Sequence, residues 1–175
     1  MPIIKVSHLE NYIRRELPLA IQKDLLNYRM VREADLETSV YFHLRNYLDS
    51  DSLWRVLARK HADTEHYIDI LIFKSKRPRI AIELKWDKKE INPKDTNSLT
   101  RAIDELNANR AYFISTITHG KHSWNKNKPF KVPIKARNIL AIFIPLGLNE
   151  EDNREWNERK RIYTSKMSKG KARHK

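Results

Sequence analysis

The sequence contains no cysteine. The chain can therefore form neither a disulfide framework nor a thiolate metal site, so any bound metal must be held by oxygen or imidazole ligands. It also has no apolar run approaching the roughly 20 residues needed to span a membrane, and its N-terminus lacks the apolar block of a secretory signal. We therefore expect an intracellular, cytoplasmic protein with no membrane partner.

Acidic residues are scarce relative to basic ones, since 22 Asp and Glu stand against 35 Lys and Arg and give a formal net charge of +13. A field of this sign attracts polyanions in a salt-dependent way, which makes nucleic acid the first candidate partner. From residue 154 to the end, nine basic and two acidic residues give 9 − 2 = +7, and the remaining 13 − 7 = +6 belongs to the body. A basic tail on an ordinary soluble domain is the alternative.

The apolar pattern of the N-terminal third predicts two helices. Ser7 followed by Glu10 resembles a capping box, and apolar residues at helical spacing predict a helix through the first 30 residues, with a break or kink at Pro18. Asp35 is predicted to cap a second helix that ends near Asp49. Residues 1–32 are thus expected to form a helical extension.

The rest of the chain predicts strands with one helix among them. Asn92 followed by Pro93 predicts the start of that helix, and a hairpin with a five-residue loop is predicted before it. The expected strands are rich in β-branched and aromatic residues and cover residues 53–58, 67–73, 79–86, 111–117 and 139–146. The order predicts an α/β domain in which an antiparallel hairpin joins a parallel part.

This organisation predicts a single domain over residues 1–164. Within it we expect a core at residues 33–148 and a C-terminal helix at residues 149–164, followed by a basic tail at residues 165–175. The polar, basic segment at residues 118–137 reads as a long loop of the kind that is usually functional.

Two acids and a lysine interrupt the most hydrophobic region of the chain. Because side chains alternate across a strand, Glu83 and Lys85 share one face of their predicted strand. If Ile70 pairs with Ile82, the apolar faces of the hairpin coincide and Asp69 lies across from Glu83. Like charges this close repel and raise the pKa of one carboxyl group unless a cation lies between them. The alternative is a solvated hairpin face with a Glu83–Lys85 salt bridge.

A divalent metal ion would remove that repulsion. Mg²⁺ prefers oxygen ligands and is typically held by one or two carboxylates together with water and substrate phosphate, which Asp69 and Glu83 could provide. Lys85 lies two residues beyond Glu83, about 6–7 Å along the strand. It is close enough to hold or activate a water that attacks a phosphate and to stabilise developing negative charge. The three residues predict metal-dependent phosphodiester hydrolysis.

The segment IDILIF…IAIELKW, with a helix before it and a helix and a strand after it, resembles the PD-(D/E)XK nuclease superfamily over residues 35–146. The resemblance implies a restriction-endonuclease-like α/β core, with a mixed sheet of four to five strands flanked by helices and preceded by the helical extension. It also implies that Asp69 and Glu83 hold Mg²⁺, with Mn²⁺ as a substitute, and that the Leu84 carbonyl completes the metal shell. Lys85 would then serve the hydrolytic water.

Many members of this superfamily also carry a glutamate on the helix before the sheet. That helix offers Glu33 and Glu37, and we favour Glu37 because it shares the sheet-facing side with Val40. The alternative for Glu37 is a first-turn acid that stabilises the helix dipole by about 0.3–1 kcal/mol. The helix after the Glu-x-Lys motif has Arg101 and Glu105 where recombination and repair exonucleases commonly carry Gln and Tyr, which argues against an end-processing exonuclease.

Basic residues outside the acidic cluster are expected to contact the nucleic-acid backbone. These candidates are Lys76, Arg77, Arg101, Lys121, Lys126 and Lys128. Together the patterns predict a Mg²⁺-dependent DNA endonuclease. With no separate sequence-reading domain in this chain, we expect selectivity for branched or junction DNA, and a homodimer could cut two strands. The alternative is a non-catalytic nucleic-acid-binding or assembly module on the same fold.

Overall fold

The computed structural model describes residues 3–27, 30–61, 67–118, 130–133 and 138–146, with only the backbone described at residues 59–61 and 130–133. Three helical positions, Arg154, Glu158 and Arg161, are also described and lie within the predicted C-terminal helix. The rest of that helix, the basic tail and the predicted contact residues Lys121, Lys126 and Lys128 lie outside the described residues. None of the described helices is both long and apolar enough to cross a membrane.

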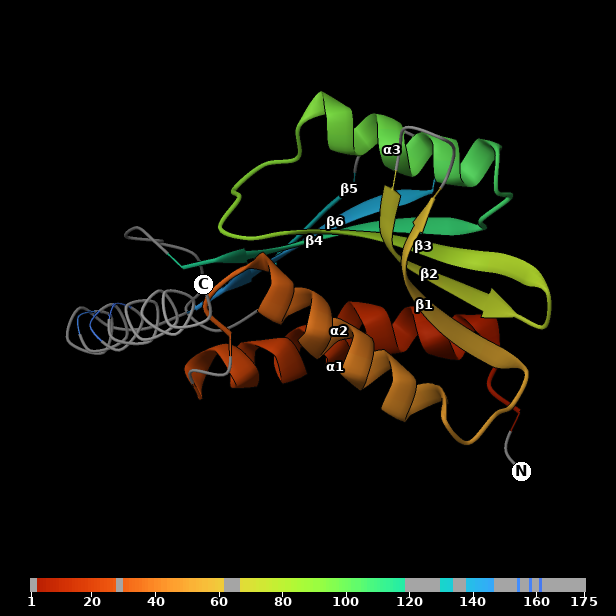
Figure 1. Cartoon of the computed structure of the whole chain (residues 1–175), viewed down its shortest axis with the longest axis horizontal. Helices are drawn as coiled ribbons and strands as arrows, with labels where there is room; N and C mark the ends of the chain where they lie inside the picture. Colours follow the sequence, from red (N-terminus) through yellow and green to blue (C-terminus); the bar gives the residue numbers. More distant parts are fainter. Residues whose placement is uncertain are drawn as a thin grey trace, which may run out of the picture.

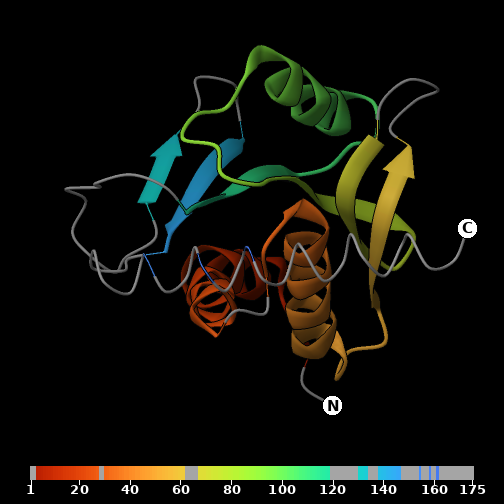
Figure 2. The same cartoon turned by 60° about the vertical axis from the view of Figure 1, so that its left-hand side comes forward.

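A mixed sheet lies between two layers of helices (Figure 1). In chain order the elements are α1 (Val6–Leu26), α2 (Glu33–Leu48), β1 (Trp54–His61), β2 (Tyr67–Lys74), β3 (Arg77–Lys85), α3 (Pro93–Asp104), β4 (Arg110–Ile117), β5 (Phe130–Pro133) and β6 (Ile139–Pro145). Figure 2 shows α3 on one face of the sheet and α1 and α2 on the other. The predicted α/β class, with a mixed sheet flanked by helices and an N-terminal helical extension, is confirmed.

The strand order is β1-β2-β3-β4-β6-β5. β2 pairs antiparallel with β1 on one side and with β3 on the other, whereas β3, β4 and β6 run parallel. The predicted change from an antiparallel hairpin to a parallel part is therefore confirmed. Among the described residues the sheet has six strands instead of the predicted four or five, because β5 pairs antiparallel with β6 from within the segment that was expected to be only a loop.

Helix α1 is held by an apolar stripe that recurs every four residues. Its fully buried members are Leu9, Ile13, Leu17, Ile21 and Leu25. The helix runs unbroken through Pro18, contrary to a predicted break. A proline inside a helix costs about 3 kcal/mol, but burying each of five large apolar side chains contributes about 1.5–3 kcal/mol, so packing outweighs the lost backbone bond.

Both predicted helix caps are wrong. Helix α1 begins at Val6, before Ser7, and its N-cap residue makes no side-chain capping hydrogen bond. Helix α2 begins at Glu33, so Asp35 already lies in its first turn. The Asp35 carboxylate instead accepts a hydrogen bond from the Val31 backbone N–H at 3.0 Å. This contact holds the segment before the helix, which begins three residues earlier than a cap at Asp35 would place it.

The β2–β3 hairpin has the predicted register, with Ile70 opposite Ile82. Its turn is shorter than predicted, because β2 ends at Lys74 and β3 begins at Arg77. A register shift between Ile72 and Phe73 brings the strand ends into pairing.

The two faces of β3 belong to two apolar cores. Ile80, Ile82 and Leu84 pack in the core that contains α1 and α2, whereas Ala81 packs with Leu99 in the core under α3. Alternation along the strand therefore places Glu83 on the α3 side of the sheet with Ala81, whereas the register shift between Ile72 and Phe73 interrupts the alternation before Ile80.

Candidate active site

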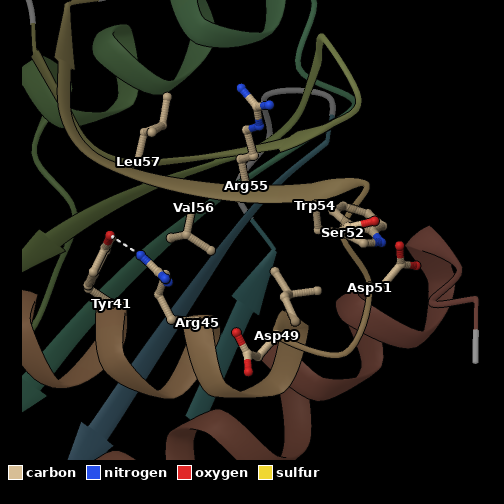
Figure 3. Close-up of a pocket in the computed structure, with 10 residues that line it drawn as sticks. Tyr41, Arg45, Asp49, Asp51, Ser52, Trp54, Arg55, Val56 and Leu57 are labelled. Carbon is tan, nitrogen blue, oxygen red and sulfur yellow. Dashed lines mark hydrogen bonds between the residues drawn. The ribbon is translucent and has the colours of Figure 1, made fainter. Parts of the chain in front are cut away.

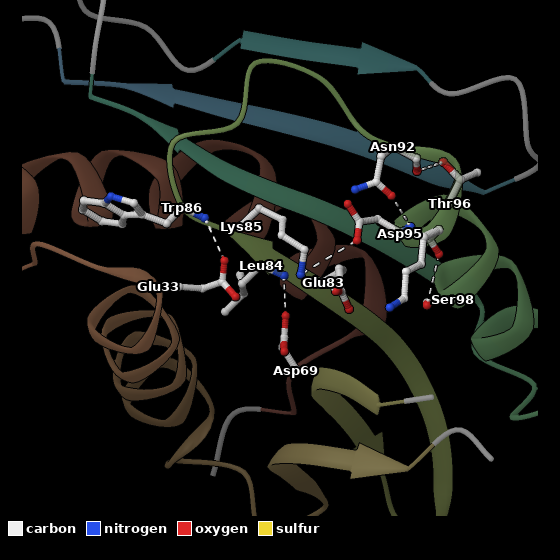
Figure 4. Close-up of polar contacts among 11 residues, drawn as sticks. Glu33, Asp69, Glu83, Leu84, Lys85, Trp86, Asn92, Asp95, Thr96 and Ser98 are labelled. Atoms are coloured by element: carbon white, nitrogen blue, oxygen red, sulfur yellow. Dashed lines mark hydrogen bonds and ion pairs between the residues drawn. The ribbon is translucent and has the colours of Figure 1, made fainter. Parts of the chain in front are cut away.

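The three predicted catalytic residues of the hairpin come together near the carboxyl end of β3 (Figure 4). The Lys85 ammonium lies 2.7 Å from a Glu83 carboxylate oxygen and 3.8 Å from an oxygen of Asp95. The Asp69 carboxylate accepts a hydrogen bond from the Leu84 backbone N–H at 2.7 Å. The site thus joins β2, β3 and the start of α3 around one lysine.

Asp95 enters the site because of the way α3 begins. The Asn92 side chain caps the helix by accepting a hydrogen bond from the Asp95 backbone N–H at 2.9 Å, and Pro93 occupies the first helical position, as predicted. The first turn of α3 therefore lies over the end of β3, on the face that carries Glu83 and Lys85. Asp95 is held there by the helix cap and by the packing of α3 on the sheet.

Two carboxylate oxygens in this cluster are buried without a hydrogen-bond partner among the described residues. They are Oε2 of Glu83 and Oδ2 of Asp95, in residues that are only 7% and 5% exposed. A buried polar atom without a partner costs about 1–3 kcal/mol, and more when the group is charged. The cluster is therefore short of hydrogen-bond donors or positive charge.

Burial and mutual repulsion raise the pKa values of the acids. Burial is the larger effect on Glu83, repulsion from Asp69 adds to it, and the bond to Lys85 opposes both, so that its pKa is raised to about 7. Burial also raises the pKa of Asp69, against the hydrogen bond from the Leu84 N–H. The pKa of Asp95 is raised by burial as well, although Lys85 lowers it.

Lys85 remains a cation despite its burial. Burial lowers its pKa, but the hydrogen bond and attraction from Glu83, together with attraction from Asp69, outweigh that effect and raise the pKa above its ordinary value. A lysine that keeps its proton at neutral pH can donate hydrogen bonds and stabilise negative charge, but it cannot accept a proton from water.

Both candidate glutamates of α2 border the site. Glu37, which we favoured, is half-buried. The charges of both glutamates raise the pKa of Asp69, and the effect of the Glu37 charge is the larger. Glu33 accepts a hydrogen bond from the Trp86 backbone N–H at 3.1 Å, and its charge also raises the pKa of Lys85 (Figure 4). The helix therefore supplies two acids, of which Glu33 contacts the end of β3 directly.

Sequence reasoning missed Asp95, and it did not foresee the contact of Glu33 with the end of β3. The signal for Asp95 was present, because the predicted Asn92–Pro93 start places the third residue after the cap in the first turn of α3. What the sequence did not reveal was that this turn lies over Glu83. The contact of Glu33 with the Trp86 N–H was not predicted, because it depends on how α2 lies against the end of β3.

Of the predicted nucleic-acid contacts, those that the structure describes do not surround the acids. Lys76 and Arg77 lie at the β2–β3 turn, and Arg77 is six residues from Glu83, about 20 Å along β3. Arg101 is exposed on α3, six residues after Asp95 and about 9 Å farther along the helix. These basic residues lie toward the opposite end of the sheet from the acids.

A pocket of about 360 Å³ lies elsewhere, between α2 and β1 (Figure 3). Arg45 is held there by a 3.2 Å hydrogen bond to the Tyr41 hydroxyl, and Val56 points toward it while Arg55 points to the opposite side of β1. The Asp51 carboxylate accepts hydrogen bonds from backbone N–H groups. None of the predicted site residues lines this pocket.

The donor chemistry of the acidic cluster fits Mg²⁺, because the cluster offers hard carboxylate oxygens and two of them lack partners. The arrangement is centred on the Lys85 ammonium. Among the residues that the structure describes, no group of three or more Asp, Glu, His or Cys side chains is placed to hold a metal ion. The predicted ligands Asp69, Glu83 and Leu84 therefore stay a prediction.

Comparison with known proteins does not identify a family. No protein-family model matches the chain, and no curated protein matches it. Among solved structures, it is similar to a chain in the refined half-complex from a tetradecameric assembly of Thermococcus gammatolerans McrB AAA+ hexamers with bound McrC, at 11% identity and a TM-score of 0.39. The alignment covers 72% of this chain and 32% of that one, so this protein spans about a third of that chain's length. A likeness this weak supports no conclusion about function.

Proposed function

We propose that the protein is a Mg²⁺-dependent DNA endonuclease that hydrolyses phosphodiester bonds. The observation that carries the proposal is the unbalanced charge at the end of β3. Glu83 and Asp95 each bury an oxygen without a partner among the described residues, and Asp69 lies close enough to raise the pKa of Glu83. One lysine cannot neutralise three carboxylates, whereas a divalent cation would supply the missing charge and bind the free oxygens.

The same acids argue against direct binding of a polyanion at this site. The net charge of +13 attracts nucleic acid to the protein as a whole. Carboxylates repel a phosphate at short range, however, so a phosphodiester needs a cation between itself and the acidic cluster. A basic protein with an acidic, cation-requiring site is what metal-dependent cleavage of a nucleic acid calls for.

Each residue has a separate role in this proposal. Asp69, Glu83 and the Leu84 carbonyl would hold Mg²⁺, which when bound supplies Lewis acidity toward phosphate and water. The Lys85 ammonium donates hydrogen bonds to the attacking water and to the phosphate, stabilising the charge that develops there. Asp95 is a positioning residue, because its contact with Lys85 keeps the ammonium charged and in place.

The finer features of the proposal rest on the sequence. Cleavage at internal bonds of the DNA strand fits the absence of the exonuclease-type Gln and Tyr on α3. The preference for branched or junction DNA stays an expectation from the sequence. A homodimer could cut two strands. We place the enzyme in the cytoplasm, with DNA as its partner.

One observation favours a second candidate function. Lys85 lies at the centre of the acids, within 2.7 Å of Glu83, so the ammonium already occupies the place where positive charge is needed. A protein in which this ion pair only holds the fold together would bind nucleic acid through its basic surfaces and cleave nothing. This is the non-catalytic nucleic-acid-binding or assembly module.

The deciding experiment incubates the purified protein with supercoiled, linear, single-stranded and four-way-junction DNA, each with Mg²⁺, Mn²⁺, Ca²⁺ or EDTA. We expect cleavage with Mg²⁺ or Mn²⁺, strongest on the junction, and binding without cleavage in Ca²⁺, which occupies oxygen sites but activates water poorly. Cleavage that persists in EDTA, or binding without cleavage under every condition, would contradict the proposal.

A further inference from the structure

A second pocket lies at the other end of the strand that carries the acids. It has a volume of about 390 Å³ and opens between the β2–β3 turn and the segment that follows α3. Its lining residues are Lys76, Arg77, Pro78, Arg79, Leu106 and Asn107. Three of them are cations and none is an acid, so the pocket is positively charged.

Arg79 shows that this pocket lacks an acceptor. One of its terminal nitrogens donates to the Asn109 side chain at 3.2 Å, which holds the guanidinium against the start of β4. Its Nε is buried and has no hydrogen-bond partner among the described residues. A buried donor on a charged group is costly when unpaired, so an acceptor placed in the pocket would relieve that cost.

The neighbouring cations are not neutralised either. Within the described part of the chain, the side chains of Lys76 and Arg77 form no ion pair. Asp104 and Glu105 precede the lining residue Leu106 in the chain, but both are exposed and neither lines the pocket. The pocket therefore presents a fixed guanidinium and two exposed cations to whatever anion enters it.

The geometry of the fold connects this pocket to the acidic cluster. Arg77, Arg79 and Glu83 all belong to β3, with the two arginines toward its amino end and Glu83 toward its carboxyl end. The N-terminal turn of α3 supplies Asp95 to the acids, and the segment after its C-terminal end supplies Asn107 to the pocket. From Glu83 to Arg79 and Arg77 is about 13–20 Å along the strand.

We propose that this pocket binds a backbone phosphate of the nucleic acid whose cleavage we assign to the acidic cluster. The ligand in this inference rests on the proposed function. Phosphate oxygens accept the bidentate and charge-assisted hydrogen bonds that a guanidinium donates, and the pocket holds no carboxylate to repel them. A separation of about 20 Å corresponds to about six base pairs at 3.4 Å each, so a duplex of ordinary length can reach both sites.

The test measures binding of a fluorescent DNA duplex in EDTA over a salt series. It compares the wild-type protein with a pocket variant and a matched control variant. One variant carries Lys76→Ala and Arg77→Ala. Its matched control carries Lys5→Ala and Lys23→Ala, which remove the same charge from exposed positions on or beside α1. Each lost phosphate contact lowers the slope of log affinity against log salt by about 1. We expect a slope lower by about 1–2 and at least tenfold weaker binding in the pocket variant only.

Arg79→Gln is a third variant and should weaken binding similarly, while circular dichroism and thermal melting confirm that each protein is folded. If Arg79→Gln fails to fold, the Lys76 and Arg77 variant decides. Equal losses in the pocket variant and its control would overturn the inference, because general charge would then explain the binding. Tight binding of inorganic phosphate with unchanged DNA binding in the variants would also overturn it, assigning the pocket to a small anion.

The outcome is separable from that of the proposed function. A wild-type protein that cleaves DNA with Mg²⁺ while the pocket variants bind normally would refute the pocket alone. Pocket-dependent binding by a protein that never cleaves would refute the nuclease and keep the pocket. A wild-type protein that binds no DNA would refute both.

Discussion

The two ends of β3 carry opposite charges. At the carboxyl end, Glu83 and Asp95 are buried around Lys85 and retain unpaired oxygens. At the amino end, Arg79 retains an unpaired nitrogen beside exposed cations. Each end concentrates one sign of charge that the described residues do not fully neutralise. The two ends therefore require different counter-ions, a cation at the carboxyl end and an anion at the amino end.

A phosphodiester with its metal ion would satisfy both needs under our proposal, because the metal would neutralise the acids and the phosphate backbone would neutralise the cations. The middle of β3 serves neither purpose. Ala81 is buried against α3 and packs in the same core as Leu99 and Ala102. Helix α3 thus covers the centre of β3, between its two charged ends.

The largest expected effect breaks the acidic end. Asp69→Asn and Lys85→Ala should each lower the cleavage rate by about 10²–10³-fold, because one removes a metal ligand and the other removes the charge that stabilises the transition state. Binding of DNA in EDTA should be retained and should tighten slightly in Asp69→Asn, which loses a negative charge near the phosphate. Single-turnover cleavage assays with filter binding measure both. Wild-type rates in the two variants would leave only the non-catalytic function.

A smaller effect is expected from Asp95, which touches Lys85 but is not assigned to the metal. Asp95→Asn should lower the cleavage rate by about tenfold, because it removes a charge that positions the ammonium. The pH profile of cleavage should also change, since Asp95 helps to keep Lys85 protonated. The matched control is Asp104→Asn, an exposed acid on the same helix that should change neither. If both variants behave alike, Asp95 has no positioning role.

The sequence predicted those features that depend on local patterns. The register of Ile70 with Ile82 was predictable because it brings the apolar faces of both strands into one core. The same alternation predicted that Glu83 and Lys85 would share a face. The start of α3 at Asn92 and Pro93 was predictable because capping and proline geometry act within one turn.

The remaining features depend on contacts between distant segments. The entry of Asp95 into the site follows from where α3 lies on the sheet, which no local pattern specifies. The burial of Pro18 within an unbroken helix follows from packing that outweighs a local penalty. The hairpin turn was predicted too long because the register shift after Ile72 leaves no mark in the pattern of apolar residues.

The pH dependence of stability tests the unbalanced charge without any assay of activity. In EDTA, the folded state holds the Glu83 proton with a pKa of about 7 against an ordinary 4.5, so it binds this proton more tightly than the unfolded state. The free energy of unfolding should therefore fall as the pH rises from 4.5 to about 7. The fall is on the order of 3 kcal/mol. Glu83→Gln lacks this titration.

Urea unfolding of the wild type and Glu83→Gln, at about pH 5 and about pH 8, measures the difference. Glu83→Gln should gain stability relative to the wild type at the higher pH. Adding Mg²⁺ at that pH should stabilise the wild type more than the variant, because only the folded wild type offers the full set of carboxylates. If the free energies of unfolding of the wild type and Glu83→Gln differ by the same amount at both pH values, the pKa of Glu83 is not raised in the folded state.

The smallest expected effects separate the two glutamates of α2. Glu37→Gln should lower cleavage by a few-fold up to about tenfold, because its charge acts on Asp69 from a half-buried position. Glu33→Gln should have less effect on cleavage and should destabilise the fold by about 0.5–1 kcal/mol, because an amide is a weaker acceptor than a carboxylate for the Trp86 N–H. Cleavage rates and urea unfolding of both variants decide between them. A larger loss of cleavage in Glu33→Gln would mean that the exposed first-turn acid, brought to the end of β3 by the early start of α2, is the glutamate that supports the reaction.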